Sequence, residues 1–197
     1  MAKRADPTAR KPTLTERARR GQLVEVTIEL VADHGYGGTS LSGIAERASI
    51  TKAAVLYHFS SKDALVRAAH EHVLSALTGH TAAAVEAADP AGAPAAYIRA
   101  MIGHLRTHPR HTRMIIEAMT HTAGDHEPAS RWRPLADLID TARDAIGTRR
   151  ALDVRTIAIV VGGGIDAIVA EQLTDPDYDT AGAAEQLVDM LDATLRG

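Results

Sequence analysis

The sequence of 197 residues contains no cysteine, and this absence excludes several kinds of chemistry. Without thiols the chain can form no disulfide, no thiolate metal site and no cysteine nucleophile, which fits a reducing compartment. Aromatic residues are also scarce, at 3% of the chain, although hydrophobic residues as a whole make up 45%. The core must therefore consist mainly of aliphatic side chains, and the abundance of Ala favours helices.

Long hydrophobic runs are missing as well. The first residues include no apolar stretch that could act as a signal peptide. The longest apolar run, residues 157–165, has nine residues and includes three glycines, well short of the roughly 20 that span a bilayer. We therefore expect a cytoplasmic protein without a membrane partner.

Positive charge is concentrated at one end of the chain. Residues 1–20 contain seven Lys and Arg against two acidic residues, whereas residues 81–197 contain 11 Arg against 17 Asp and Glu. A basic end on an acidic body suggests that this end meets a polyanion. A solvated tail explains residues 1–13 equally well, and we interpret this proline-containing segment as a flexible basic arm.

The spacing of apolar residues is helical from about residue 15 to the C-terminus, and no stretch alternates as a strand would. The sequence therefore predicts an all-α fold with about nine helices. Gly35 is placed to end the first helix in a left-handed conformation. Ser40 and Thr51 are placed to cap two short helices that follow.

These two short helices and the helix before them match a helix-turn-helix unit. Ala45 and Val55 should face inward, where the helices cross. On the opposite face, the small Ala53 would let the second short helix enter a major groove, and Lys52 and Tyr57 could reach phosphates. The same spacing would also suit three amphipathic helices in any small bundle.

The run from Thr39 to Leu65 resembles the DNA-binding domain of TetR-type transcriptional regulators. It contains an Ile-Ala pair at 44–45, a Tyr-His-Phe sequence at 57–59, and a Lys-Asp-x-Leu start to the next helix at 62–65. The resemblance implies a homodimer that binds a palindromic operator in double-stranded DNA. It further implies a repressor that a small, largely apolar molecule releases, although activation stays open.

The resemblance also assigns residues to DNA contacts. The eight implied contacts are Ser40, Thr51, Lys52, Ala53, Ala54, Tyr57, His58 and Lys62. Phe59 would instead lie in the core. Ser49 stands where the family usually has Gly, and a left-handed conformation at a residue other than Gly costs on the order of 1 kcal/mol. The exposed face has no Arg, Asn or Gln, so specificity would rest on methyl contacts, the arm or DNA shape.

By the same resemblance, residues 14–60 form the DNA-binding domain and residues 61–197 a ligand-binding and dimerisation domain. The implied effector pocket is lined by Tyr97, Met101, His104, Leu105, Met114, Met119 and Trp132. The implied dimer interface uses Val161, Gly164, Ile165, Ile168, Leu187 and Leu191. Ordinary core packing is the alternative for the first set, and a monomer with both C-terminal helices folded on its own body is the alternative for the second.

Two further patterns suggest other functions. Gly162, Gly164 and Ala167 superficially fit a dinucleotide-binding fingerprint, but the apolar spacing around them is helical and no second strand is evident. His104 and His108 are four residues apart, which suits a helical metal pair, but Pro109 places His108 at a helix boundary. We predict no catalytic residue, metal or cofactor. The alternative is a small all-helical enzyme or metal-binding protein that uses the region of these two histidines.

Overall fold

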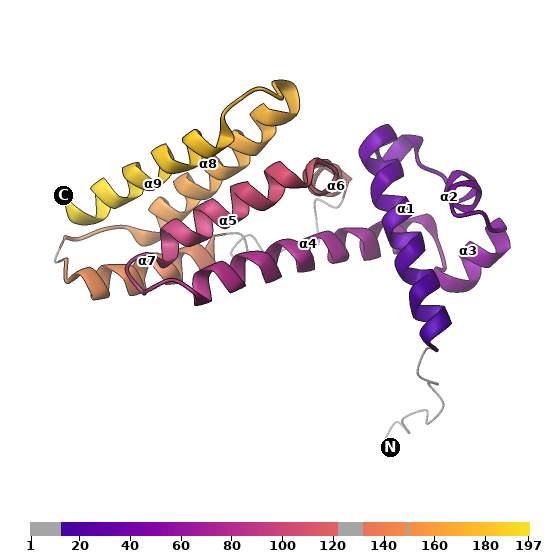
Figure 1. Cartoon of the computed structure of the whole chain (residues 1–197), viewed down its shortest axis with the longest axis horizontal. Coiled ribbons are helices and arrows are strands. Elements are labelled where there is room, and N and C mark those ends of the chain that lie inside the picture. The colour runs from indigo at the N-terminus through magenta and orange to yellow at the C-terminus, as the bar shows by residue number, and fades with distance from the viewer. Residues whose placement is uncertain (1–12, 122–131, 149) are drawn as a thin grey trace, which may run out of the picture. The chain divides into compact units, whose positions relative to one another are not determined.

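A computed structural model describes residues 13–121, 132–148 and 150–197 (Figure 1). Within these ranges every regular element is an α-helix, which confirms the predicted fold class and the expected number of helices. The nine helices are α1 (Leu14–Gly38), α2 (Leu41–Arg47), α3 (Lys52–His58), α4 (Lys62–Glu86), α5 (Ala93–Thr107), α6 (Pro109–His121), α7 (Arg133–Ile146), α8 (Val154–Thr174) and α9 (Thr180–Arg196).

The chain divides into two compact units, Met1–Ala69 and His70–Gly197. The division falls inside α4 and not at residue 60, where the sequence had suggested it. Leu65 and Ala69, in the first two turns of α4, are fully buried and belong to the N-terminal unit. We call the second unit the body.

In the N-terminal unit, α1 packs against both α2 and α3, and these two helices pack against each other (Figure 1). Thr13 and Glu16 form a capping box at the start of α1. Gly35 interrupts the same helix with a φ of 69° and a ψ of 172°, a conformation that essentially only glycine adopts. The predicted break at Gly35 is therefore present, but its ψ is not that of the expected left-handed cap, and one more helical turn follows before the helix ends at Gly38.

In the body, α5 packs against α7, α8 and α9, and α8 also packs against α7 and α9. Their shared core is aliphatic and includes Ile98, Ile102 and Ile139, each no more than 1% exposed. Asp153 and Asp179 cap α8 and α9, since each carboxylate accepts a backbone N–H three residues ahead. Helical packing and not a sheet thus organises this part of the chain.

Helix α8 includes the glycines of the dinucleotide-like pattern, so the helical interpretation of that segment is confirmed. In the described part of the chain, α8 is also the helix that is long and apolar enough to span a membrane, by length and composition only. The longest apolar run does not reveal this property because Asp166 ends it after nine residues. Asp166 lies in the middle of α8, and a charge at that depth in a bilayer is costly.

Only 22% of the most apolar window of α8 is buried inside the chain. This helix therefore has two apolar sides. One faces the core of the body, and the other is open.

Candidate nucleic-acid interface

A tight turn joins α2 to α3 and fixes the angle between them. Ser49 adopts a φ of 54° and, among the described residues other than glycine, no other has a positive φ. Its N–H donates to the carbonyl of Glu46 at 3.0 Å, and the N–H of Ile50 donates to the carbonyl of Ala45 at 2.9 Å. Ser49 therefore keeps the left-handed geometry of the turn without the glycine that would adopt it most easily.

Buried side chains hold the two short helices together. Ile44 and Val55 are completely buried, and Ala45 is 4% exposed. Phe59, directly after α3, is also 4% exposed, so it lies in the core as the resemblance implied. These contacts fix which side of α3 faces outward.

The outward side of α3 carries the predicted DNA-binding residues. Lys52 and Ala53 are exposed and Ala54 is half-buried, while Tyr57 leaves 75% of its surface exposed. Thr51 caps the helix, because its Oγ1 accepts the N–H of Ala54 at 3.1 Å. This side of α3 is therefore a narrow, largely uncharged surface with one lysine at its N-terminal end.

Ser40 and His58, two further implied contacts, also have partners within this unit. Ser40 Oγ accepts the N–H of Gly43 at 3.1 Å and so caps α2. His58 is half-buried, and its ring meets that of Tyr57 edge-on with centroids 5.0 Å apart. Capping and a phosphate contact are compatible for Ser40, since a hydroxyl that accepts a hydrogen bond still has a proton to donate.

An arginine that the sequence did not single out supports the end of α3. The Arg20 guanidinium lies 4.0 Å from the centroid of the Phe59 ring and donates to the carbonyl of His58. This carbonyl belongs to the last residue of α3, where helix carbonyls lack intrahelical partners. Arg20 lies 38 residues from His58 in sequence, so no local pattern could reveal the contact.

Lys62 has a structural role that the resemblance did not indicate. Its Nζ donates to the carbonyls of Tyr36 at 2.9 Å and Thr39 at 3.2 Å, and it lies 3.8 Å from the centroid of the Tyr36 ring. The Tyr36 hydroxyl donates to Asp63, and this bond is the main reason that the pKa of Tyr36 is raised above its usual value. Lys62 and Asp63 thus fasten the segment between α1 and α2. Since a lysine has three N–H donors and two are used here, Lys62 keeps one for another partner.

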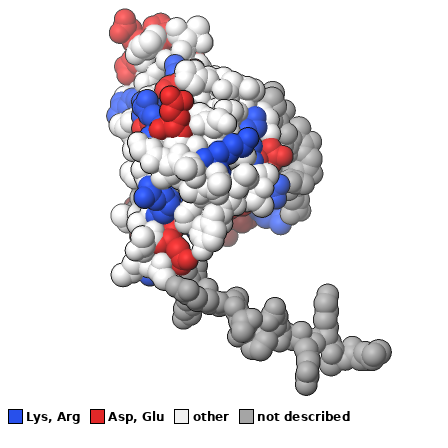
Figure 2. Space-filling view, turned by 90° about the vertical axis from the view of Figure 1, so that its right-hand side faces the viewer, with Lys and Arg blue, Asp and Glu red and all other residues white. Residues whose placement is uncertain are grey.

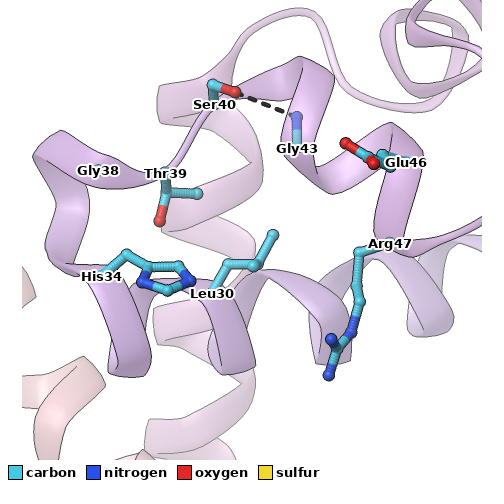
Figure 3. A pocket seen from close by; sticks show the side chains of 8 residues that line it. All are labelled: Leu30, His34, Gly38, Thr39, Ser40, Gly43, Glu46 and Arg47. Carbon is cyan, nitrogen blue, oxygen red and sulfur yellow. Dashed lines mark hydrogen bonds between the residues drawn. The ribbon is translucent and has the colours of Figure 1, made fainter.

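A cavity of about 480 Å³ opens between α1 and α2 on the same unit (Figure 3). Leu30 and His34 line it from α1, and Ser40, Glu46 and Arg47 line it from α2 and its cap. The Arg47 guanidinium pairs with Glu29 at 3.1 Å. The cavity is open, its lining combines polar and apolar groups, and no sequence motif indicates it.

The surface charge over this unit is mixed. Figure 2 shows blue Lys and Arg side chains separated by uncharged surface and accompanied by red carboxylates. The described part of the unit therefore has no continuous basic patch in this view. Contacts to DNA would therefore depend on a few individually positioned side chains more than on a broad positive electrostatic potential.

Four of the seven predicted effector-pocket residues belong to the hydrophobic core of the body or pack against it. Leu105 belongs to the hydrophobic core of the body, and Tyr97, Met101 and Trp132 are partly buried against it. Burial, and to a lesser degree Asp166, raises the pKa of Tyr97. Met114 is completely buried on α6, whereas the side chain of Met119 lies outside the described residues.

The predicted dimer residues require a correction. Val161, Ile165 and Leu191 are at most 5% exposed and belong to the core of a single chain. They face inward because α8 and α9 pack on the body with these sides. Side chains buried in this way are not available to a second copy.

The other three predicted dimer residues lie where α8 meets α9. A Cβ atom on Gly164 would lie 3.2 Å from Leu187 Cδ1, so the missing side chain allows the close approach of the two helices. Ile168 and Leu187 are partly buried against the same core. The exposed apolar residues of these helices are instead Ile159, Val160 and Met190, with 47%, 64% and 66% of their surfaces exposed.

The described part of the body also brings histidines together. His104, near the end of α5, His108, its C-terminal cap, and His111, in the first turn of α6, each offer a ring nitrogen, and these nitrogens lie within 4.8 Å of one another. His80 of α4 adds a fourth ring, 5.4 Å from that of His104. Burial, then the neighbouring His108, His111 and His80, lower the pKa of His104 to about 4.

Pro109 argued against a metal pair of His104 and His108 because it separates His108 from a continuous helix. The structure shows that the helix break turns α6 so that His111 returns toward His104. His126 lies outside the described residues, as does the side chain of His121.

The α1–α3 geometry defines a helix-turn-helix protein. A family model described as "Bacterial regulatory proteins, tetR family" matches residues 23–69. Through these residues the chain carries the DNA-binding domain of the TetR family. The resemblance found in the short motifs is therefore confirmed.

Individual relatives agree with this assignment. The HTH-type transcriptional regulator BetI of Burkholderia thailandensis is 38% identical over 84 residues, which cover 43% of this chain and 42% of that protein. The chain is thus aligned to less than half the length of this relative.

Solved structures extend the similarity of fold. A TetR-like transcriptional regulator from a Rhodococcus species matches with a TM-score of 0.76 at 20% identity, covering 95% of this chain and all of that one. The fatty acid degradation regulator FadR from Bacillus halodurans matches with a TM-score of 0.72 at 15% identity, covering 92% and 96%. At such identities the likeness concerns the fold alone.

Proposed function

We propose that the chain is a cytoplasmic transcriptional regulator that binds double-stranded DNA through the outward side of α3. The observation that carries this proposal is the combination of a TetR-family helix-turn-helix with an α3 whose Lys52, Ala53 and Tyr57 are exposed. Tyr57 is a large aromatic residue with 75% of its surface open. A side chain of this kind, placed at the end of a helix that can enter a groove, suits contact with a sugar-phosphate backbone.

Each residue on this side has a proposed part. Ala53 and Ala54 let the backbone of α3 approach the base edges, while Lys52 reaches a phosphate or base. Tyr57 and His58, at the C-terminal end of α3, contact the sugar-phosphate backbone of the DNA. A set with so few hydrogen-bonding groups would read methyl groups and groove shape more than base edges.

The helix caps extend the proposed contact to neighbouring phosphates. Ser40 and Thr51 hold the first amides of α2 and α3, and their hydroxyl protons remain available to a phosphate oxygen. Lys62 contributes its remaining N–H donor next to them. Its main effect is to position the segment between α1 and α2 through Tyr36.

The proposed assembly is a homodimer that reads a palindromic operator, because two copies of α3 related by a two-fold axis contact two half-sites. Support comes from the open apolar side of α8 and α9, where Val160 and Met190 lie exposed. A second copy of the same surface would cover them. Charged substitutions, Val160→Asp with Met190→Asp, should convert the dimer to monomers in analytical ultracentrifugation. The control Ser75→Asp, at an exposed position of α4, should leave the dimer intact.

The proposed effector is a small, largely apolar molecule bound in the body near Tyr97, Met101 and Trp132. These side chains are partly buried against the aliphatic core, so they offer apolar walls and one hydroxyl. As a repressor, the protein would leave its operator when the effector binds. To change the operator from nearly fully occupied to nearly empty, the effector must bind the released state of the protein about 5 kcal/mol more favourably than the DNA-binding state.

The test of DNA binding starts from the DNA next to the gene that encodes this chain. Purified protein should protect a palindromic segment of that DNA in a footprinting experiment. Its affinity should fall with rising salt, by about 0.9 decade per decade of salt for each phosphate contacted. Equal affinity for this DNA and for unrelated DNA across the salt range would contradict the proposal.

A further inference from the structure

The three histidines at the joint between α5 and α6 form a group that DNA binding does not use. His104 lies near the end of α5, His108 caps it, and His111 lies in the first turn of α6. One ring nitrogen from each lies within 4.8 Å of the others. The residues are therefore close enough to serve a common ligand after small side-chain rotations.

Two of the nitrogens already face each other. His104 Nε2 lies 3.1 Å from His111 Nδ1. Two nitrogens bound to one tetrahedral zinc ion at 2.0–2.1 Å lie roughly 3.3 Å apart. The separation in the structure is thus close to the one that a shared metal ion requires, and an ion can replace the proton that the two rings share.

The third ring is held in the tautomer that a ligand needs. His108 Nδ1 lies 2.9 Å from the carbonyl oxygen of His104 and 2.9 Å from Thr107 Oγ1. A carbonyl can only accept, so Nδ1 carries the proton and Nε2 keeps its lone pair. Metal-bound histidines commonly donate their other N–H to a backbone carbonyl in this way.

The packing of the rings also brings the donors to one place. The His104 and His108 rings are stacked with centroids 4.3 Å apart and an interplanar angle of 15°, and the His108 and His111 rings follow at 4.9 Å and 22°. His104 is only 7% exposed and His111 is half-buried, whereas His108 is exposed and gives an ion access from solvent. His104 and His108 lie at the carboxyl end of α5, whose dipole favours a cation, but His111 lies at the amino end of α6, whose dipole opposes one, so the helix dipoles do not decide the affinity.

The chemistry of the donors restricts the ion. Neutral imidazole suits zinc, nickel and copper, whereas calcium and magnesium prefer oxygen ligands. The chain has no cysteine that could add a thiolate. Three imidazoles leave a fourth position for water or for His80, whose ring centroid lies 5.4 Å from that of His104.

We propose that His104, His108 and His111 bind one divalent transition-metal ion, of which zinc is the representative, and that the ion fastens the end of α5 to the start of α6. This inference goes beyond the proposed regulatory function and does not depend on DNA binding. Since ligands come from both sides of the break at Pro109, the ion would restrict the angle between the two helices.

The experiment uses the full chain without a histidine tag, stripped of metal with a chelator. Zinc chloride is titrated in a calorimeter, and cobalt(II) is added in parallel because tetrahedral cobalt has characteristic visible absorption. We expect one ion per chain and a rise in melting temperature with zinc. His108→Ala combined with His111→Ala should weaken binding by at least about tenfold and abolish the rise.

A matched control separates the site from general affinity of histidines for metals. His34→Ala removes an exposed histidine from the N-terminal unit and should leave zinc binding unchanged. Far-ultraviolet circular dichroism checks that the double variant remains folded. The proposal is overturned if the unmodified chain does not bind one ion, if the double variant binds as tightly, or if His34→Ala causes an equal loss. Because no DNA is present, failure of this proposal is distinguishable from failure of the proposed function.

Discussion

The N-terminal unit and the body differ in the range of the contacts that build their sites. In the N-terminal unit, Ser40 and Thr51 each bond an amide three residues ahead, and these caps fix where α2 and α3 begin. In the body, Arg99 pairs with Glu185 across 86 residues, and the core joins α5, α7, α8 and α9. A short motif can therefore specify the first site, whereas the second depends on how distant helices pack.

The two units also differ in the chemical character of their exposed residues. On α3 the outward residues include Lys52, the small Ala53 and the phenol of Tyr57, beside a partly exposed Leu56, and the first three suit a hydrated, charged partner. On α8 and α9 the outward residues Val160 and Met190 are apolar, which suits a protein partner. One chain thus presents two surfaces with different chemistry, and variants can separate them.

The largest expected effect is the loss of stability of one unit, after a core substitution, while the other unit stays stable. Ile44 in α2 and Ile139 in α7 are both completely buried. Replacing either with Ala should lower the unfolding free energy of its own unit by about 2–5 kcal/mol. Hydrogen exchange read by mass spectrometry should show faster exchange in α1–α3 for Ile44→Ala and in α5–α9 for Ile139→Ala. Uniform acceleration throughout the chain in both variants would show that the two units unfold as one.

A smaller effect separates the two lysines of the N-terminal unit. Lys62→Ala removes the bonds to the carbonyls of Tyr36 and Thr39 and should destabilise this unit by about 1–3 kcal/mol. Lys52→Ala, at an exposed position, should change stability by less than about 0.5 kcal/mol. Chemical denaturation followed by circular dichroism measures both. If the two variants are equally stable, the structural role of Lys62 is wrong.

The smallest effect concerns the turn between α2 and α3. Ser49→Gly relieves the left-handed strain and should stabilise the N-terminal unit by up to about 1 kcal/mol. Ser60→Gly, at an exposed position without a positive φ, should instead be neutral or slightly destabilising. Thermal denaturation of the two variants compares them directly. A loss of stability in Ser49→Gly equal to that in Ser60→Gly would argue against strain at Ser49.

The sequence predicted most of the N-terminal unit because its signals are local. Glycine at position 35, hydroxyl caps and the apolar spacing of Ile44 and Val55 each act within a few residues. What it missed there are contacts between distant residues, such as Arg20 with the carbonyl of His58 and Lys62 with the ring of Tyr36. No periodic pattern records such pairs.

The body was predicted less well, also for a physical reason. An apolar helix such as α8 has helical spacing on more than one side, so the sequence cannot tell which side meets its own core. Val161 and Ile165 were therefore placed at a dimer interface although they are buried within the chain. The histidine group was undervalued because Pro109 was taken only as a break, whereas the turn it allows brings His111 back to His104.

The central claim is that the outward side of α3 binds the operator, and one measurement tests it most directly. Fluorescence anisotropy with the footprinted DNA compares the unmodified chain with the Lys52→Ala, Tyr57→Ala double variant. Tyr178→Ala, an exposed tyrosine of the body, is the matched control. The account predicts that the double variant remains a folded dimer and loses operator binding, while the control binds normally. Unchanged operator affinity in the double variant would contradict it.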